Sequence, residues 1–237
     1  MKRQPTCSPR QRRSYGLYGP YLRVVDRTVN NFYFQGMARP RTFDEAQVLR
    51  AVRDQFWNKG YAATSMDDLM QATGLGKGSL YGAFGDKHQL FLKVFDAYCV
   101  SSVEAVKKTL EGPDAGALER LRQYLLGVAT ASAAPANRRG CLLGRGTAEL
   151  AAQDAQVADR ALETFRGLEA AFVRCLEQAR AHGDLAAQAD PRKLGAMLLA
   201  VMRGLEAVGK AGMDEASLRG MVETAFEGLP APAKRRR

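Results

Sequence analysis

TSMDDLMQATGLGKGSLYGAFGDK, residues 64–87, is the stretch that decides the fold of this chain. Ser65 is placed to cap a helix, and Asp68, three residues later, can complete a capping box with it. Gly74 then ends that helix, because glycine readily adopts the left-handed conformation found after a helix C-terminus. Apolar side chains return at helical spacing just beyond the glycines. The stretch therefore predicts two short helices joined by a turn.

The second short helix, predicted over about Lys77 to Ala83, has one apolar and one polar side. Leu80 and Phe84 stand four residues apart and point together toward a core. The opposite side is left to solvent, and a helix-turn-helix presents such a side to the major groove of DNA. We expect four residues of this side to contact phosphates or base edges, or to let the backbone approach them: Lys77, Gly78, Ser79 and Tyr81.

The motifs of this region resemble those of the TetR family of bacterial transcriptional regulators. The resemblance implies an all-α protein, with an N-terminal three-helix helix-turn-helix DNA-binding head and a C-terminal helical bundle for ligand binding and dimerisation. Gly82 and Ala83 depart from the pattern, because the family often has His or Tyr there, and a frequent phosphate contact is therefore in doubt. The matching residues are Gly60-Tyr61, Thr64-Ser65, Leu69, Thr73-Gly74-Leu75, Lys77-Gly78-Ser79-Leu80-Tyr81, Phe84 and Lys87.

Further residues beside the two short helices are candidates for contacts with the DNA backbone. Thr64 and Ser65 stand where the free amides of a helix start favour a phosphate oxygen. Lys87 should act likewise at the start of the next helix. Arg39 and Arg41 precede the first helix and can reach a flanking phosphate or the minor groove.

Three of these DNA-contact candidates have a simpler interpretation that the sequence leaves open. Ser65 can serve as a helix cap with or without a DNA contact. Tyr81 can belong partly to the core, and Lys87 can be a solvated surface charge.

Helical periodicity extends through the rest of the chain, and no strand pattern occurs in it. A first helix is predicted from Asp44 to Lys59, and a fourth begins at Asp86 and continues into the second domain. We place the DNA-binding domain at residues 38–93 and the ligand-binding and dimerisation domain at residues 94–229. The predicted core of the head contains Phe56, Leu69, Leu80, Phe84 and Phe91, and the later helices are predicted at 116–133, 142–152, 156–182, 191–210 and 214–227.

The net charge of +10 lies in the two ends of the chain. Residues 1–36 contain seven Lys or Arg and one Asp, and residues 234–237 add four basic residues, so the stretch between them is formally neutral. The prediction of DNA binding therefore rests on the motif and not on the overall charge.

Residues 1–37 are predicted to be a disordered tail or a remnant before a start at Met37, and residues 230–237 a basic tail. Residues 31–36 resemble the recognition site of tobacco etch virus protease, which favours the remnant. The alternative is a basic arm that grips DNA nonspecifically.

Two C-terminal segments carry more apolar surface than one core needs, which predicts a partner. Pairing of two copies would space two recognition helices for a palindromic site. The alternative is that these side chains only complete the core of a single copy. The residues concerned are Met197, Leu198, Val201, Leu205, Val208, Leu218, Met221, Val222 and Phe226.

Cys141 is the most chemically suggestive residue of the second domain. It follows Arg138 and Arg139 at a predicted helix start, where positive charge favours the reactive thiolate. Some TetR-family regulators with a similar Gly-Cys-Leu run respond to electrophiles, so the resemblance makes Cys141 a candidate sensor. The alternative is a buried small hydrophobe, which we also expect of Cys99 and Cys175.

The sequence shows no pattern of a catalytic or metal site. It has two histidines, His88 and His182, and no C-x-x-C, G-x-S-x-G or H-E-x-x-H motif. No apolar run is long enough for a membrane span, and no signal-peptide pattern is present. We therefore expect a cytoplasmic protein that is not an enzyme and has no cofactor.

These patterns together predict a repressor that binds a palindromic double-stranded DNA operator as a homodimer. A small-molecule inducer or an electrophile would release it from the operator. The alternative is an all-helical enzyme or an adaptor protein with an incidental helix-turn-helix.

Overall fold

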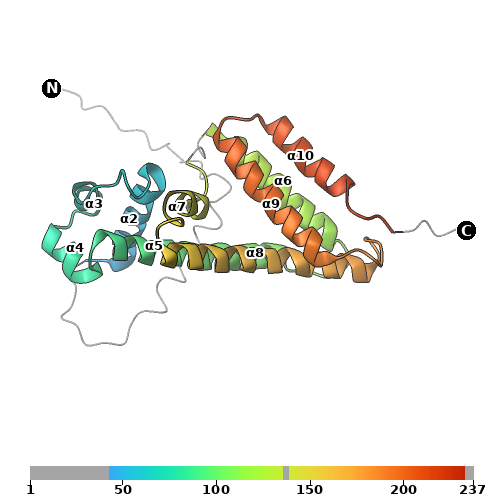
Figure 1. Cartoon of the computed structure of the whole chain (residues 1–237), viewed down its shortest axis with the longest axis horizontal. Coiled ribbons are helices and arrows are strands. Elements are labelled where there is room, and N and C mark those ends of the chain that lie inside the picture. Colours follow the sequence, from blue (N-terminus) through green and yellow to red (C-terminus); the bar gives the residue numbers. More distant parts are fainter. Residues whose placement is uncertain (1–42, 136–138, 233–237) are drawn as a thin grey trace, which may run out of the picture.

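The computed structural model describes residues 43–135 and 139–232, and this part of the chain is helical, without strands. Arg39, Arg41, Arg138 and most of the two predicted tails lie outside the described residues. Three short helices form a head at one end of the molecule, and a fourth, much longer helix leaves it (Figure 1). They are α2 (Glu45–Lys59), α3 (Met66–Thr73), α4 (Lys77–Phe84) and α5 (Lys87–Leu110).

Local signals in the sequence set the bounds of α3. The Ser65 hydroxyl accepts from the Asp68 amide, and the Asp68 carboxylate accepts from the Ser65 amide, so the predicted capping box is present. A hydrogen bond from Lys59 is the main reason that the pKa of Asp68 falls to about 2. Gly74 ends the helix in the left-handed conformation, with φ 69°.

The head has its own small apolar core. Leu69 and Leu80 are fully buried, and Phe84 is 7% exposed, so the apolar side of each short helix faces inward. The rings of Phe56 and Phe91 meet edge to face with their centroids 5.2 Å apart. The five residues predicted for this core are all buried. Because α5 supplies Phe91, the head depends on a helix that it shares with the rest of the molecule.

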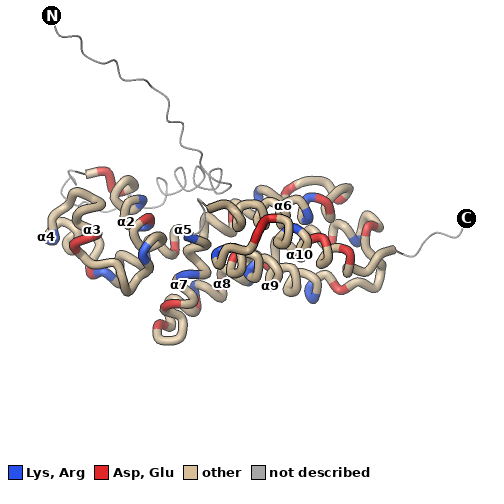
Figure 2. The backbone as a smooth tube through the Cα atoms, turned by 90° about the horizontal axis from the view of Figure 1, so that it is seen from above, with Lys and Arg blue, Asp and Glu red and all other residues tan. Residues whose placement is uncertain are grey.

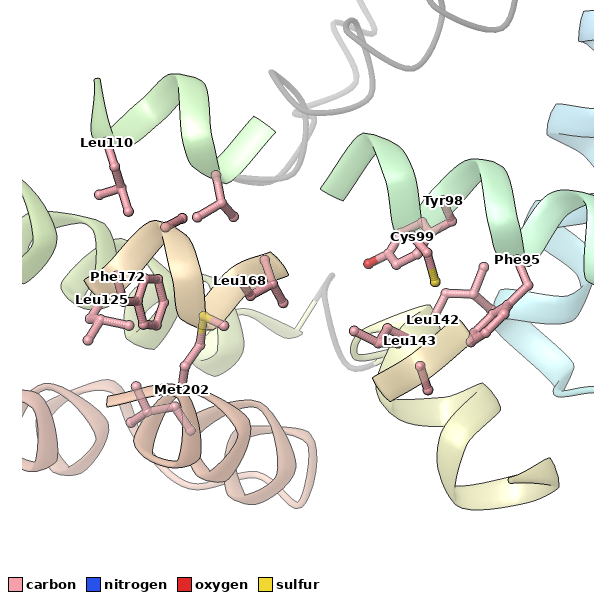
Figure 3. Close-up of a cluster of buried hydrophobic side chains, with 14 of the residues drawn as sticks. Phe95, Tyr98, Cys99, Leu110, Leu125, Leu142, Leu143, Leu168, Phe172 and Met202 are labelled. Carbon is pink, nitrogen blue, oxygen red and sulfur yellow. The ribbon is translucent and has the colours of Figure 1, made fainter. Parts of the chain in front are cut away.

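The remaining helices form a bundle against the far part of α5. Helix α8 (Ala155–His182) lies along α5, while α6 (Ala117–Ala133), α9 (Pro191–Lys210) and α10 (Glu215–Glu227) lie together at the other end of the molecule (Figure 1). Buried side chains from several of these helices meet, among them Leu125, Phe172 and Met202 (Figure 3). The proposed division between residues 93 and 94 falls inside α5, which belongs to both parts.

Helix α7 (Leu142–Leu150) lies between the head and the bundle (Figure 1). Its first residues, Leu142 and Leu143, are buried and face side chains of α5 (Figure 3). A Cβ at Gly146 would stand 2.7 Å from the ring of Phe95, so only glycine allows α7 to approach α5 this closely. None of the helices in the described ranges is long and apolar enough to cross a membrane.

Candidate DNA-binding surface and regulatory cluster

The polar side of α4 is exposed, as the spacing of its apolar residues predicts. Lys77, Gly78, Ser79 and Tyr81 are all exposed, and Tyr81 keeps 38% of its surface accessible. The Lys77 ammonium lies 5.6 Å from the centroid of the Tyr81 ring, so the two side chains share one face of the helix. Lys77 and Tyr81 therefore lie together on the exposed part of α4, to which Gly78 and Ser79 also belong.

Packing against the described residues does not explain why α4 contains glycines. A Cβ added at Gly78 or Gly82 would meet nothing within 4 Å. Glycine inside a helix costs roughly 1 kcal/mol relative to alanine. Two such residues in a helix of eight leave its outer backbone bare, and a bare backbone lets another surface come close. The N-cap is Gly76, which has no side chain that could accept from the first amides of α4.

The start of α3 offers fewer groups for a contact with DNA than the sequence indicates. Ser65 is exposed, but its hydroxyl already serves the cap. Thr64 is fully buried, its hydroxyl donates to the Gly60 carbonyl, and its amide donates to the Tyr61 carbonyl. The prediction that Thr64 contacts DNA is therefore wrong, because its polar groups are used to shape the turn before α3.

Lys87 and the acidic residues of the head limit how far the basic surface extends. Lys87 is half-buried, with its ammonium 4.4 Å from the centroid of the Tyr61 ring, and burial lowers its pKa. Helix α3 presents Asp67 and Asp68, whereas the charged residue of α4 is Lys77 (Figure 2). The charge of α4 is therefore positive, whereas that of α3 is negative.

A pair of residues from α7 holds the head. The guanidinium of Arg145 donates to the backbone carbonyls of Trp57, Asn58 and Lys59 at 3.2, 3.2 and 2.8 Å. These carbonyls belong to the last turn of α2, which has no partners for them within the helix. Arg145 therefore caps a helix of the head from the bundle side.

Glu149 completes the same attachment, and we call the pair Arg145 and Glu149 the α7 clamp. Its carboxylate accepts from the amides of Tyr61 at 3.0 Å and Ala62 at 2.6 Å. Gly60, between the two contact points, has φ 89°. The α7 clamp thus fixes both sides of the turn that leads into α3.

Cys141 is the N-cap of α7 and lies beside two donors. Its sulfur is 3.4 Å from the Tyr98 hydroxyl and 3.6 Å from Nη1 of Arg203. Arg139, which the sequence places beside the thiol, instead lies over the Trp57 ring at 3.8 Å and pairs with Asp54 at 3.7 Å. Among the described residues, the arginine at the sulfur is therefore Arg203 of α9 and not Arg139.

Arg203 is the residue of this cluster that the sequence analysis missed. Its side chain is 22% exposed and pairs with Glu206 at 2.7 Å. Burial works against its charge, but Glu206 raises the pKa of the guanidinium above its usual value. The available signal was a charged pair within the otherwise apolar period of α9, one turn after Leu199.

The other described cysteines are core residues, as predicted. Cys99 and Cys175 are each 1% exposed. Burial raises the pKa of Cys99 to about 12, which leaves it as an unreactive thiol.

The apolar side chains of α9 and α10 divide between the inside and the outside. Leu198, Leu205, Leu218 and Val222 are buried within the chain, so the prediction of surplus surface is wrong for these four residues. Met197 and Met221 remain 39% and 40% exposed. Four exposed positions of α9 are small, namely Ala196, Ala200, Gly204 and Ala207, whereas Lys193, one turn before Met197, is charged and exposed.

Comparison with known proteins agrees with this architecture in both parts of the chain. The family described as bacterial regulatory proteins, tetR family, matches residues 48–94, and the tetracyclin repressor-like C-terminal domain matches residues 117–225. The uncharacterized HTH-type transcriptional regulator YezE of Bacillus subtilis (strain 168) is 30% identical over 149 residues, which are 63% of this chain and 76% of YezE. The transcriptional repressor ComR of Escherichia coli (strain K12) is 26% identical over 187 residues, 79% of this chain and 88% of ComR.

Solved structures show the same fold with DNA bound. A cysteine mutant of the TetR family transcriptional regulator CifR, complexed with 26-base-pair operator DNA, has 28% sequence identity and a TM-score of 0.67. The match covers 81% of this chain and all of that one. The helix-turn-helix head, the helical bundle and these matches identify the chain as a member of the TetR family of transcriptional regulators.

Proposed function

We propose that this protein is a repressor that binds a palindromic operator as a homodimer and leaves it when a small molecule binds the bundle. The observation that carries the proposal is the exposed face of α4, where Lys77 and Tyr81 lie beside Gly78 and Gly82, two residues without side chains. Such a face suits the major groove, because the helix backbone can come close to the duplex. CifR, which was solved on its operator, supports this assignment.

Lys77 and Tyr81 have separate roles in this proposal. Lys77 carries the charge that pairs with a phosphate or a guanine edge, and Tyr81 offers a hydroxyl to a phosphate. Ser79 is also exposed on α4. Ser65 keeps its role as the N-cap of α3, and the positive end of that helix would face a phosphate.

The proposed dimer pairs α9 and α10 with the same helices of a second copy. The small exposed residues of α9 allow two helices to approach closely, and Met197 and Met221 supply apolar surface to bury. A two-fold axis through these helices would repeat the α4 face on one side of the dimer. We place this regulator in the cytoplasm, where its DNA is.

The proposed release begins near Cys141 and reaches the head through α7. Cys141 caps the helix whose Arg145 and Glu149 hold the α2–α3 turn, so a change at the thiol and a change at the head share one short element. Cys141 is half-buried, so part of its surface is open to solvent and the rest packs against the protein. A Cys141→Ser protein that still releases DNA when treated with a quinone would remove the thiol from the mechanism.

A gel shift on DNA upstream of the gene for this protein tests operator binding. We expect Lys77→Ala to weaken binding by roughly 1 kcal/mol or more, and to reduce the salt slope by about 1 if it contacts a phosphate. Tyr81→Phe tests the hydroxyl alone. Lys107→Ala is the matched control, because Lys107 lies on α5 and pairs with Glu104 at 2.7 Å.

The outcomes of the gel shift separate the repressor from its alternatives. Equal binding by the wild type, Lys77→Ala and Lys107→Ala would favour the adaptor or enzyme interpretation. Loss of binding in Lys107→Ala as well would point to a general charge effect instead of a reading face.

A further inference from the structure

The Nε atom of Arg203 is the one buried side-chain nitrogen or oxygen without a hydrogen-bond partner in the described part of the chain. A buried donor that lacks a partner is costly, and proteins seldom keep one without a use. The other two nitrogens of this guanidinium are engaged, Nη2 by Glu206 at 2.7 Å and Nη1 by the Cys141 sulfur at 3.6 Å. The Nε–H group of Arg203 therefore has no acceptor among the described residues and is available to a ligand.

The surroundings of Arg203 are aromatic and weakly polar. The guanidinium carbon lies 5.9 Å from the centroid of the Phe165 ring, and Tyr98 reaches the same sulfur as Arg203. Tyr124 bonds through its hydroxyl to the sulfur of Met202, the residue before Arg203. Aromatic walls around a few fixed polar groups are typical of sites for small organic molecules.

Helix α6 carries a glycine one turn after Tyr124. Gly127 follows Tyr124 by three residues and so lies on the same side of α6. A Cβ added there would meet no atom within 4 Å, although Gly127 itself is half-buried. The space beside Gly127 is therefore not filled by another side chain of the described residues.

We propose that Arg203 is the recognition residue of the inducer site and that it takes the oxygen of a small carbonyl compound, such as a ketone, aldehyde or quinone, through its free Nε–H. A carbonyl suits this position better than a carboxylate, because Glu206 already neutralises the guanidinium. The Phe165 ring and the ring of Tyr124 would hold the apolar part of the ligand. This inference rests on the proposed function, because it names the ligand that would release the operator.

Ketones without an activated alkene are the appropriate probes, because they cannot undergo conjugate addition to Cys141. We would measure the binding of 2-butanone, cyclohexanone and acetophenone by calorimetry and by thermal shift. Each probe is paired with a compound of similar shape that lacks the carbonyl, such as ethylbenzene for acetophenone. Benzoate tests the carboxylate alternative.

Arg203→Lys is the decisive variant. It keeps a positive charge for Glu206 but removes the Nε–H donor, so the fold should tolerate it better than loss of the ion pair. The double variant Arg203→Met/Glu206→Met removes both charges and serves if the lysine variant is unstable. Arg160→Lys is the matched control, because the Nε of Arg160 on α8 is already bound to Asp96 at 2.6 Å.

We expect at least one ketone to bind the wild type more tightly than its hydrocarbon partner and more tightly than benzoate. Arg203→Lys should weaken that ketone about tenfold, as for the loss of one buried hydrogen bond, and Arg160→Lys should not. Equal ketone affinity in the wild type and Arg203→Lys would overturn the inference. So would a failure of all three ketones to outbind their partners, or a crystal structure in which a water stays on Nε in the presence of the ketone.

The operator gel shift without any probe distinguishes this inference from the proposed function. If the wild type does not bind the operator, the proposed function fails. If the wild type and Arg203→Lys both bind the operator but no ketone depends on Arg203, the proposed function stands and the carbonyl site does not.

Discussion

Gly60 connects the two halves of the molecule at the scale of a single residue. It has φ 89°, a backbone conformation that residues other than glycine rarely adopt. A Cβ at this position would also stand 2.7 Å from Oε2 of Glu149 and 3.0 Å from Nε of Arg145. The same glycine therefore permits the turn before α3 and the close approach of the α7 clamp.

Gly60→Ala should destabilise the protein by more than the cost of its backbone conformation. Gly74→Ala is the control, because Gly74 has φ 69° but nothing within 4 Å of an added Cβ. We expect Gly74→Ala to cost about 1–2 kcal/mol of unfolding free energy, and Gly60→Ala to cost roughly 1–3 kcal/mol more because the clamp must shift. Urea unfolding of both variants measures the difference, and equal midpoints would show that the clamp yields freely.

Helix α7 shows, at the scale of the element, what the sequence can and cannot predict. Its start and its cysteine are legible from the chain, because helical periods and Gly-marked breaks are local. Its contacts are not, since Arg145 and Glu149 meet residues more than 85 positions earlier. For the same reason the residue that approaches Cys141, Arg203, could not be assigned from a sequence in which Arg138 and Arg139 were the obvious neighbours.

The exposed face of α4 was the easier prediction. It depends on spacings within eight residues, and a short helix with Leu80 and Phe84 buried can present only one other side. Thr64 was misassigned because a hydroxyl before a helix can turn inward to a carbonyl as readily as outward, and only the packing decides.

Arg145→Ala should loosen the head while the bundle stays intact. Removing three hydrogen bonds to the last turn of α2 leaves its carbonyls without these partners, at a cost of roughly 1.5–3 kcal/mol. Hydrogen exchange should therefore speed up in α2 and α3 but not in α8 or α9. Arg180→Ala is the control, because Arg180 donates to a carbonyl within the bundle, that of Ala189 at 3.1 Å.

At the scale of the whole molecule, the placement of charge and exposed apolar surface separates two working ends. Lys77 marks the head end, and Met197 and Met221 mark the exposed face of the α9–α10 pair. Between these ends the described chain is formed by helices packed on one another, so either end can be altered without touching the other (Figure 1).

Ala200→Arg should convert the proposed dimer to a monomer. A bulky charge on the small exposed side of α9 would prevent close approach of the same helix in a second copy. Light scattering after size exclusion measures the mass. Leu162→Glu is the control, because Leu162 is 47% exposed on α8, a helix outside the proposed α9–α10 pairing, and its substitution should leave the dimer unchanged. A wild type that is itself monomeric at all concentrations would remove the dimer from the proposal.

Helix α5 is uninterrupted over 24 residues, and at 1.5 Å per residue it is about 36 Å long. A rod of this length works as a lever, because a tilt of about 10° at its distal end moves the other end by about 6 Å, roughly the advance of two base pairs along a duplex. Small shifts of the bundle helices can thus misalign the two α4 faces of a dimer. Glycines introduced midway along α5 would make the helix flexible there and absorb that motion, so the repressor would no longer respond to its ligand.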